Sequence, residues 1–105
     1  MIASFDLTIP SGQTDSNVYV IPSGMGVEQL TIFAPAALTG VVTLYLGVGG
    51  STFASLLPAV LGVTNVTIVA AKAAPLLVGP FRSIGVKSGS AEGAARVFTV
   101  VAQIE

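Results

Sequence analysis

VVTLYLGVGG, residues 41–50, is the stretch of this 105-residue chain that most clearly specifies a fold. Its side chains alternate with the two-residue period of a β-strand, Val42, Leu44, Leu46 and Val48 on one face against Val41, Thr43 and Tyr45 on the other. Because both sets are largely apolar, we expect both faces of this strand to be mostly buried. The Gly49-Gly50 pair predicts a hairpin into a further strand over 51–57.

This strand lies inside a long segment without charge, since no Asp, Glu, Lys or Arg occurs between Gln29 and Lys72. Such a segment can be a membrane span, a buried core or a contact surface. A transmembrane helix needs about 20 predominantly apolar residues. Here, breakers recur too often for a clean span, at Pro35, Gly40, Gly47, Gly49, Gly50, Pro58 and Gly62. The pattern favours short strands joined by turns, and no membrane partner is expected.

Similar runs occupy the rest of the chain. In the first, Phe5, Leu7 and Ile9 share one face and Asp6 and Thr8 the other, before a turn at Pro10-Ser11-Gly12. Further strands are predicted over 17–21, 27–34, 65–70, 81–87 and 96–104, with a short edge strand over 76–78. Pro22-Ser23-Gly24 should stop the second strand, and Glu28 makes the alternation of the third begin imperfectly.

Two connecting segments have their own signals. The alanine cluster at Ala70, Ala71, Ala73 and Ala74 is compatible with one helical turn, which Pro75 would end. Residues 88–95 are small and predict a flexible loop. About seven to nine short strands without a convincing helix indicate an all-β, antiparallel β-sandwich or jelly-roll-like fold. The length predicts one such domain over residues 1–105.

The surface of this domain should carry few charges. Four Lys and Arg residues and five Asp and Glu residues make up 9% of the chain, whereas a well-behaved soluble surface is about 25–35% charged. A folded chain of this size exposes roughly 5,400 Å², so about 600 Å² of surface accompanies each charge. Uncharged faces of this size favour contact with another protein, and we expect an assembly component.

Several classes of function lack the residues they need. The net charge of −1 and the dispersed cations give no field for nucleic acid. Without histidine or cysteine, a Ser-His-Asp or Cys-His mechanism and the usual zinc sites cannot be built. Residues 1–6 lack the basic and apolar regions of a secretory signal, so synthesis and use without Sec export are expected.

The remaining candidates for polar chemistry are weak. Asp6 and Asp15 flank the first turn and could meet, as could Glu28, but solvated carboxylates are the expected reading. Asp15 with Ser16 and Asn17 offers oxygen ligands for calcium without the repeated acids of a loop site. An enzyme remains an alternative only if two of these acids converge.

Glycines, aromatics and arginines give the last candidates. Residues 23–26 and 47–50 are glycine-rich but lead into no helix with a lysine, so turns rather than phosphate loops are expected.

Three aromatics that could form a platform for a sugar or peptide are expected instead in the core: Tyr19, Tyr45 and Phe53. Arg82 and Arg96 open the last two strands and are expected to pair with Glu92 or with a partner's carboxylate, contributing about 0–1 kcal/mol if exposed. No catalytic, cofactor-binding or metal-binding residue is assigned, and no small-molecule substrate is expected.

The order of several motifs resembles that of small β-sandwich virion proteins of tailed bacteriophages. In the first half these are Ile9-Pro10-Ser11-Gly12-Gln13-Thr14, Ala34-Pro35-Ala36-Ala37-Leu38-Thr39-Gly40 and Ser51-Thr52-Phe53. In the second half they are Val66 to Ala71, Pro75-Leu76, Phe81-Arg82-Ser83-Ile84, Ser88-Gly89 and Arg96-Val97-Phe98-Thr99-Val100. The motifs are loose but extend over nearly the whole chain. The neutral Gly49-Gly50 turn departs from the pattern, in which an acidic turn is typical.

This resemblance implies a non-enzymatic capsid decoration or cement protein. Such a protein is made in the host cytoplasm and binds the outer surface of the virion head where major capsid subunits meet. The expected partners are the major capsid protein and further copies of this chain, for example in a trimer. The alternatives are a head-fibre, neck or tail component, or a module that binds host glycans. The interaction surface stays unassigned from the sequence.

Overall fold

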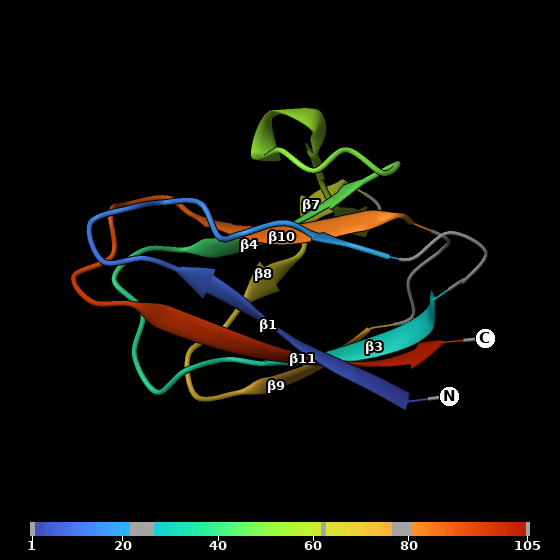
Figure 1. Ribbon diagram of the computed structural model, residues 1–105. Coiled ribbons are helices and arrows are strands. Elements are labelled where there is room, and N and C mark those ends of the chain that lie inside the picture. The colour runs from blue at the N-terminus through green and yellow to red at the C-terminus, as the bar shows by residue number, and fades with distance from the viewer. Residues whose placement is uncertain (1, 22–26, 62, 77–80, 105) are drawn as a thin grey trace.

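A computed structural model describes residues 2–21, 27–61, 63–76 and 81–104 of the chain. In Figure 1 this part of the chain forms two stacked layers of strands, and it includes one short 3₁₀ turn, η1 (Phe53–Ser55). The strands are β1 (Ile2–Ile9), β2 (Tyr19–Val20), β3 (Val27–Phe33), β4 (Val42–Gly47), β5 (Leu57–Pro58), β6 (Val60–Leu61), β7 (Thr64–Asn65), β8 (Thr67–Ile68), β9 (Ala73–Leu76), β10 (Ser83–Ser88) and β11 (Arg96–Ile104). No helix in these ranges has the length and apolar character needed to cross a bilayer.

The two layers are antiparallel sheets with interleaved connections. Sheet A has the order β1-β11-β3-β9, and sheet B has the order β2-β10-β4-β5 with β8 also paired to β4. The chain passes from one sheet to the other between β1 and β2, β2 and β3, β3 and β4, β8 and β9, β9 and β10, and β10 and β11. This is the double-sheet arrangement of a jelly roll. The predicted all-β antiparallel sandwich is confirmed.

The core lies between the two sheets, and each sheet contributes one set of side chains to it. Sheet A contributes Leu7, Ile9, Leu30, Ile32, Phe98, Val100 and Ala102, and sheet B contributes Val42, Leu44, Ile68, Ile84 and Val86. Each set follows the two-residue alternation of its strand. The accessible surface of 5452 Å² agrees with the value expected from the chain length.

β1 confirms the faces predicted for it from the sequence, and its partner in sheet A is β11. The two strands pair antiparallel over their whole shared length, from Ile2 opposite Gln103 to Ile9 opposite Arg96. The turn predicted after β1 is also present, closed by a hydrogen bond from the Gln13 N–H to the Pro10 carbonyl oxygen. Gly12 has a φ of +80°, which a residue without Cβ adopts at little cost.

The imperfect start of the third strand has a structural cause. The register shifts between Gln103 and Ile104, which face Gln29 and Val27, so position 28 is an extra residue and the β-bulge lies within β3. Val27 is therefore buried, as are Leu30 and Ile32, although the spacing from 27 to 30 is odd. The side chain of Glu28 lies outside the described part of the structure.

The region after β4 differs from the predicted tight hairpin. Of the strand predicted over 51–57, only Leu57 belongs to a strand, β5. The chain instead makes η1 and returns antiparallel to β4 only at β5, with Leu57 opposite Leu46. Phe53 and Leu56 pack on the outer face of sheet B, where Gly47 and Gly85 leave room for them. The outer face of β4 is thereby half-buried, close to the burial expected for both of its faces.

The strand predicted over 65–70 is divided because the chain changes partner at Val66. Thr64 and Asn65 pair with β6, whereas Thr67 and Ile68 pair with β4. Between them, the Val66 N–H donates to the Ala59 carbonyl oxygen and the Val66 carbonyl oxygen accepts from the Leu44 N–H, both at 2.9 Å. Two-residue strands of this kind have no periodicity from which to predict them.

The helical turn predicted for the alanine cluster is wrong. Ala70 and Ala71 form a turn in which Ala71 has a φ of 59°, and Ala73 and Ala74 already belong to the edge strand β9. The predicted edge strand over 76–78 therefore begins three residues earlier, and residues 77–80 lie outside the described ranges. The second strand is likewise reduced to Tyr19 and Val20, and the stop expected at 22–24 lies outside those ranges too.

Candidate functional site

The acidic residues considered for catalysis have separate partners. The Asp6 carboxylate accepts a hydrogen bond of 3.1 Å from the Thr99 hydroxyl on the outer face of sheet A. Asp15 forms an exposed ion pair with Lys87, with 3.6 Å between Oδ1 and Nζ. The structure thus gives Asp6 and Asp15 different surroundings, and no general acid–base pair is assembled from them.

The oxygen atoms considered for calcium are occupied by the protein itself. The Ser16 hydroxyl donates to the Asn17 carbonyl oxygen and accepts from the Val86 N–H. The Asn17 side chain is bonded to the backbone of β1. In the ranges that the structure describes, no three acidic residues gather as a metal site.

The glycine-rich stretch at 47–50 is a turn, as expected. Gly49 has a φ of +122°, and its N–H donates to the Ser83 hydroxyl at 3.0 Å. That donor is therefore used by the fold rather than offered to a phosphate. The other glycine-rich stretch, 23–26, lies outside the described residues.

The three aromatics considered for a platform fall into two groups. Tyr19 stacks on Phe5 with 3.9 Å between ring centroids and an interplanar angle of 6°, joining β2 of sheet B to β1 of sheet A. Tyr45 contacts Phe53 on the outer face of sheet B, at 5.1 Å and 52°. All four rings are half-buried, so each pair contributes mainly to packing. Tyr19 packs against the core as expected, whereas the core position expected for Tyr45 and Phe53 is wrong.

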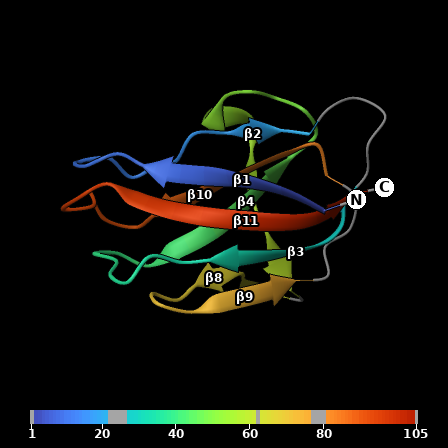
Figure 2. The same ribbon diagram turned by 60° about the horizontal axis from the view of Figure 1, so that its bottom comes forward.

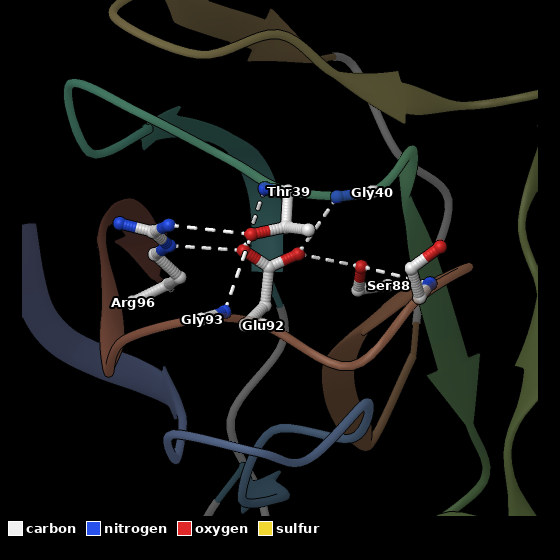
Figure 3. A network of polar contacts seen from close by, with 7 residues as sticks. Thr39, Gly40, Ser88, Glu92, Gly93 and Arg96 are labelled. Carbon is white, nitrogen blue, oxygen red and sulfur yellow. Dashed lines mark hydrogen bonds and ion pairs between the residues drawn. The ribbon is translucent and has the colours of Figure 1, made fainter.

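The most organised polar cluster is centred on Glu92, which lies in the loop between β10 and β11 and is only 1% exposed. Figure 3 shows its carboxylate between two loops and the start of β11. Oε1 accepts from the Thr39 N–H at 2.8 Å and from the Arg96 Nε at 2.9 Å. Oε2 accepts from the Gly40 N–H at 3.0 Å and from the Ser88 hydroxyl at 2.7 Å. Both oxygens thus have two donors.

These donors decide the charge of Glu92. Burial alone would raise the pKa of the carboxyl group, but the hydrogen bonds from Ser88, Thr39, Gly40 and Arg96 outweigh it and lower the pKa to about 2. Glu92 is therefore ionised near neutral pH. A carboxylate with its four acceptor sites filled and no access to solvent is suited to holding loops together, not to proton transfer.

The backbone of Glu92 joins a third loop to the cluster. Its carbonyl oxygen accepts from the Gly12 N–H at 2.7 Å, and its N–H donates to the Gln13 carbonyl oxygen at 3.0 Å. The predicted pairing of Arg96 with Glu92 is confirmed. The pair is not an exposed one, because the Glu92 side chain is fully buried. The loop over 88–95, which was expected to be flexible, is tied by Glu92 to residues 12–13 and 39–40.

Sequence reasoning missed the burial of Glu92. The available signal was a lone acid among small residues, four positions before an arginine. Gly40 is a second part of the site: a Cβ there would overlap the Ser88 hydroxyl. Only a residue without a side chain allows this loop to approach the carboxylate so closely.

The surface offers two candidates for protein contact. The first is the outer face of sheet A, which carries one charge among its described strand residues, Asp6. Its side chains are Ile2, Ser4, Asp6, Thr8, Val97, Thr99, Val101, Gln103, Gln29, Thr31, Phe33, Ala73 and Pro75. A shallow hollow of about 320 Å³ lies on this sheet between Ile2, Gln103, Gln29 and Pro75.

The second candidate is the segment between β4 and β8, named here the outer segment (residues 48–61 and 63–66). In Figure 1 it projects from sheet B, away from sheet A. Its sequence carries no charge. Four of its large apolar side chains are exposed: Val48 (94%), Leu57 (74%), Val60 (52%) and Val63 (100%). Exposed apolar groups concentrated in one projecting segment are typical of a protein contact surface.

No protein-family model matches the sequence, and no curated protein matches it. Among solved structures, a chain from Bacillus endospore appendages, described as a family of disulfide-linked pili, has 17% identity and a TM-score of 0.49. The Yersinia pseudotuberculosis-derived mitogen has 13% identity and a TM-score of 0.50. Both alignments cover 98% of this chain and 85% of the other. At this identity the likeness concerns the fold alone, a small antiparallel β-sandwich. Neither protein is described as a virion component, so the bacteriophage resemblance stays a prediction.

Proposed function

We propose that this chain is a non-enzymatic structural subunit of a tailed-bacteriophage virion, specifically a decoration or cement protein on the outer surface of the head. It binds where major capsid subunits meet and stabilises the shell. Its partners are the major capsid protein and further copies of itself, and it is made in the host cytoplasm. Nucleic acid, membranes and small-molecule substrates have no part in this role.

The outer segment is the observation that carries the proposal. It places Val48, Leu57, Val60 and Val63 in solvent on a rigid base, because Phe53 and Leu56 anchor it to sheet B. Burying one such apolar side chain contributes about 1.5–3 kcal/mol. A shell presents many equivalent sites, so modest contacts of this kind add up through multivalency.

The polar residues support a role without catalysis. The buried carboxylate, Glu92, has all its acceptor sites filled by the fold. Asp6 and Asp15 have separate partners. The glycan-binding alternative is disfavoured by the division of the aromatic residues into one pair that joins the two sheets and one pair on sheet B.

A binding experiment with heads that lack the protein tests the proposal. We expect the purified chain to co-sediment with such heads and to raise the temperature at which they open. Val60→Lys should weaken binding about tenfold, because a charge must then be desolvated at the contact. Val97→Lys is the matched control, since Val97 is similarly exposed but lies on sheet A. Localisation of the chain to the neck or tail of intact particles, or no binding to heads, would contradict the proposal.

A further inference from the structure

β1 is the longest edge strand in the described part of the protein. It has eight residues and pairs with β11 on one side only, as Figure 2 shows at the margin of sheet A. The outer side of an edge strand presents N–H and C=O groups that can pair with another strand. The two halves of this edge differ in how those groups are used.

Asn17 seals the half that ends at Ile9. Its Oδ1 accepts from the Thr8 N–H at 2.7 Å, its own N–H donates to the Thr8 carbonyl oxygen at 3.3 Å, and its Nδ2 donates to the Asp6 carbonyl oxygen at 3.4 Å. The buried Ser16 holds Asn17 in place, since its hydroxyl bonds both to the Asn17 carbonyl oxygen and to the Val86 N–H of β10. No further strand can pair along this half.

The other half of the edge is open. Because backbone groups alternate with a period of two, the N–H and C=O groups of Ile2 and Ser4 point to the same side as those of Thr8. Among the described residues, none donates to or accepts from them on that side. Residues 2–5 contain no charge and no proline, the usual protections of an edge strand.

The remaining edges of the described protein are poor partners. β9 has four residues, and Pro75 in it has no N–H to donate. β2, β5, β6, β7 and β8 have two residues each. The edge that best matches the open half of β1 is therefore the same edge in a second copy of this chain.

We infer that two copies join through the open halves of their β1 strands, antiparallel and around a two-fold axis at Ala3. In this register Ile2 of each copy exchanges its backbone hydrogen bonds with Ser4 of the other. The two sheets A then form one continuous sheet. This inference concerns self-association and does not depend on the proposed virion role.

The register follows from which groups are free. An axis at Ser4 would pair Ile2 with Asp6, whose carbonyl oxygen already bonds to Asn17. An axis at Ala3 uses only groups of the open half, and it keeps the two Asp6 carboxylates out of the paired region. Two-fold pairing of identical surfaces is also the commonest closed symmetry.

A single cysteine tests this register directly, because the chain has none of its own. Ala3 would face its copy as a non-hydrogen-bonded pair, with Cα atoms about 4.5 Å apart, within the range of about 4.4–6.8 Å that a disulfide spans. Under mild oxidation, Ala3→Cys should form a covalent dimer at least tenfold faster than Thr8→Cys, which lies in the sealed half. Equal rates for the two variants would overturn the inference.

A second experiment removes the hydrogen bond without a cross-link. Ser4→Pro deletes an N–H that points outward, a position where an edge strand tolerates proline, whereas Ser4→Ala keeps it. In sedimentation experiments from micromolar to millimolar protein, the wild type and Ser4→Ala should dimerise reversibly, and Ser4→Pro should associate about tenfold more weakly. Strictly monomeric wild-type protein, or unchanged dimerisation of a folded Ser4→Pro variant, would refute the pairing.

Discussion

At the scale of single residues, the buried charge of Glu92 holds together the loops at one end of the sandwich. Two backbone N–H groups, a hydroxyl and a guanidinium surround its carboxylate. Replacing it by Gln removes the charge that Arg96 faces and turns one acceptor into a donor beside other donors. We expect Glu92→Gln to lower the free energy of unfolding by about 3 kcal/mol at neutral pH, measured by urea denaturation. Asp15→Asn, in an exposed ion pair, should cost no more than about 1 kcal/mol.

The same carboxylate predicts how stability depends on pH. Its pKa is about 2 in the folded protein and 4.5 as the reference for the unfolded chain. A lowered pKa stabilises the fold fully above the unfolded value, and this contribution disappears as the pH falls from about 4.5 toward 2. At about pH 3, roughly 2 kcal/mol of it should be gone. The wild type should then exceed Glu92→Gln by only about 1 kcal/mol, so an unchanged difference between the two proteins would contradict this assignment.

The sequence predicted the partner of Glu92 but not its environment. Glu92 was one of two partners expected for Arg82 and Arg96, the other being a carboxylate of a partner protein, and the structure pairs it with Arg96. Burial depends on Ser88 at the end of β10 and on Gly40, which comes from the loop between β3 and β4 and reaches Glu92 only through the packing of the two sheets. The role of Asn17 was missed for the same reason, since its bonds to Asp6 and Thr8 form only when residues 14–17 are held against β10.

At the scale of secondary-structure elements, the contact of the outer segment with sheet B depends on Gly85. A Cβ at this position would lie 2.6 Å from the Phe53 ring and 3.3 Å from Leu56. Gly85→Ala should therefore displace the ring and destabilise the protein by about 1–3 kcal/mol, measured by thermal or urea unfolding. Gly89→Ala is the control, since its nearest neighbour is at 3.7 Å, and it should change stability by less than about 1 kcal/mol.

A double mutant separates this clash from a general intolerance of strand glycines. With Phe53→Ala already present, the ring that the new Cβ meets is gone. Gly85→Ala should then cost clearly less than it does in the wild type, giving an interaction energy of about 0.5–3 kcal/mol. Additive effects of the two substitutions would show that Phe53 does not cover Gly85 in solution.

Strands with one buried face could be predicted from the sequence. The covering of the outer face of sheet B by the outer segment could not. β1 and β11 alternate over eight and nine residues, so their buried faces follow from the sequence alone, and β11 has the predicted bounds, 96–104. Between residues 48 and 68 the chain changes partner every few residues, from β4 to β6 and back. The buried Gly85 gave no signal, because glycine has no side chain whose polarity marks a face.

At the scale of the whole molecule, the two sheets share one core and should unfold together. Phe98 of sheet A and Ile84 of sheet B are both fully buried in the same cluster. Phe98→Ala should cost about 3–5 kcal/mol and Ile84→Ala about 2–5 kcal/mol. Both tyrosines belong to sheet B, so their fluorescence follows that sheet, while circular dichroism follows all strands. A single cooperative domain requires the two signals to shift by the same amount even when the cavity is made in sheet A by Phe98→Ala. Separate transitions for the two signals would show that residues 1–105 unfold as two units. In a single shared core, removing the Phe98 ring from sheet A must also destabilise sheet B.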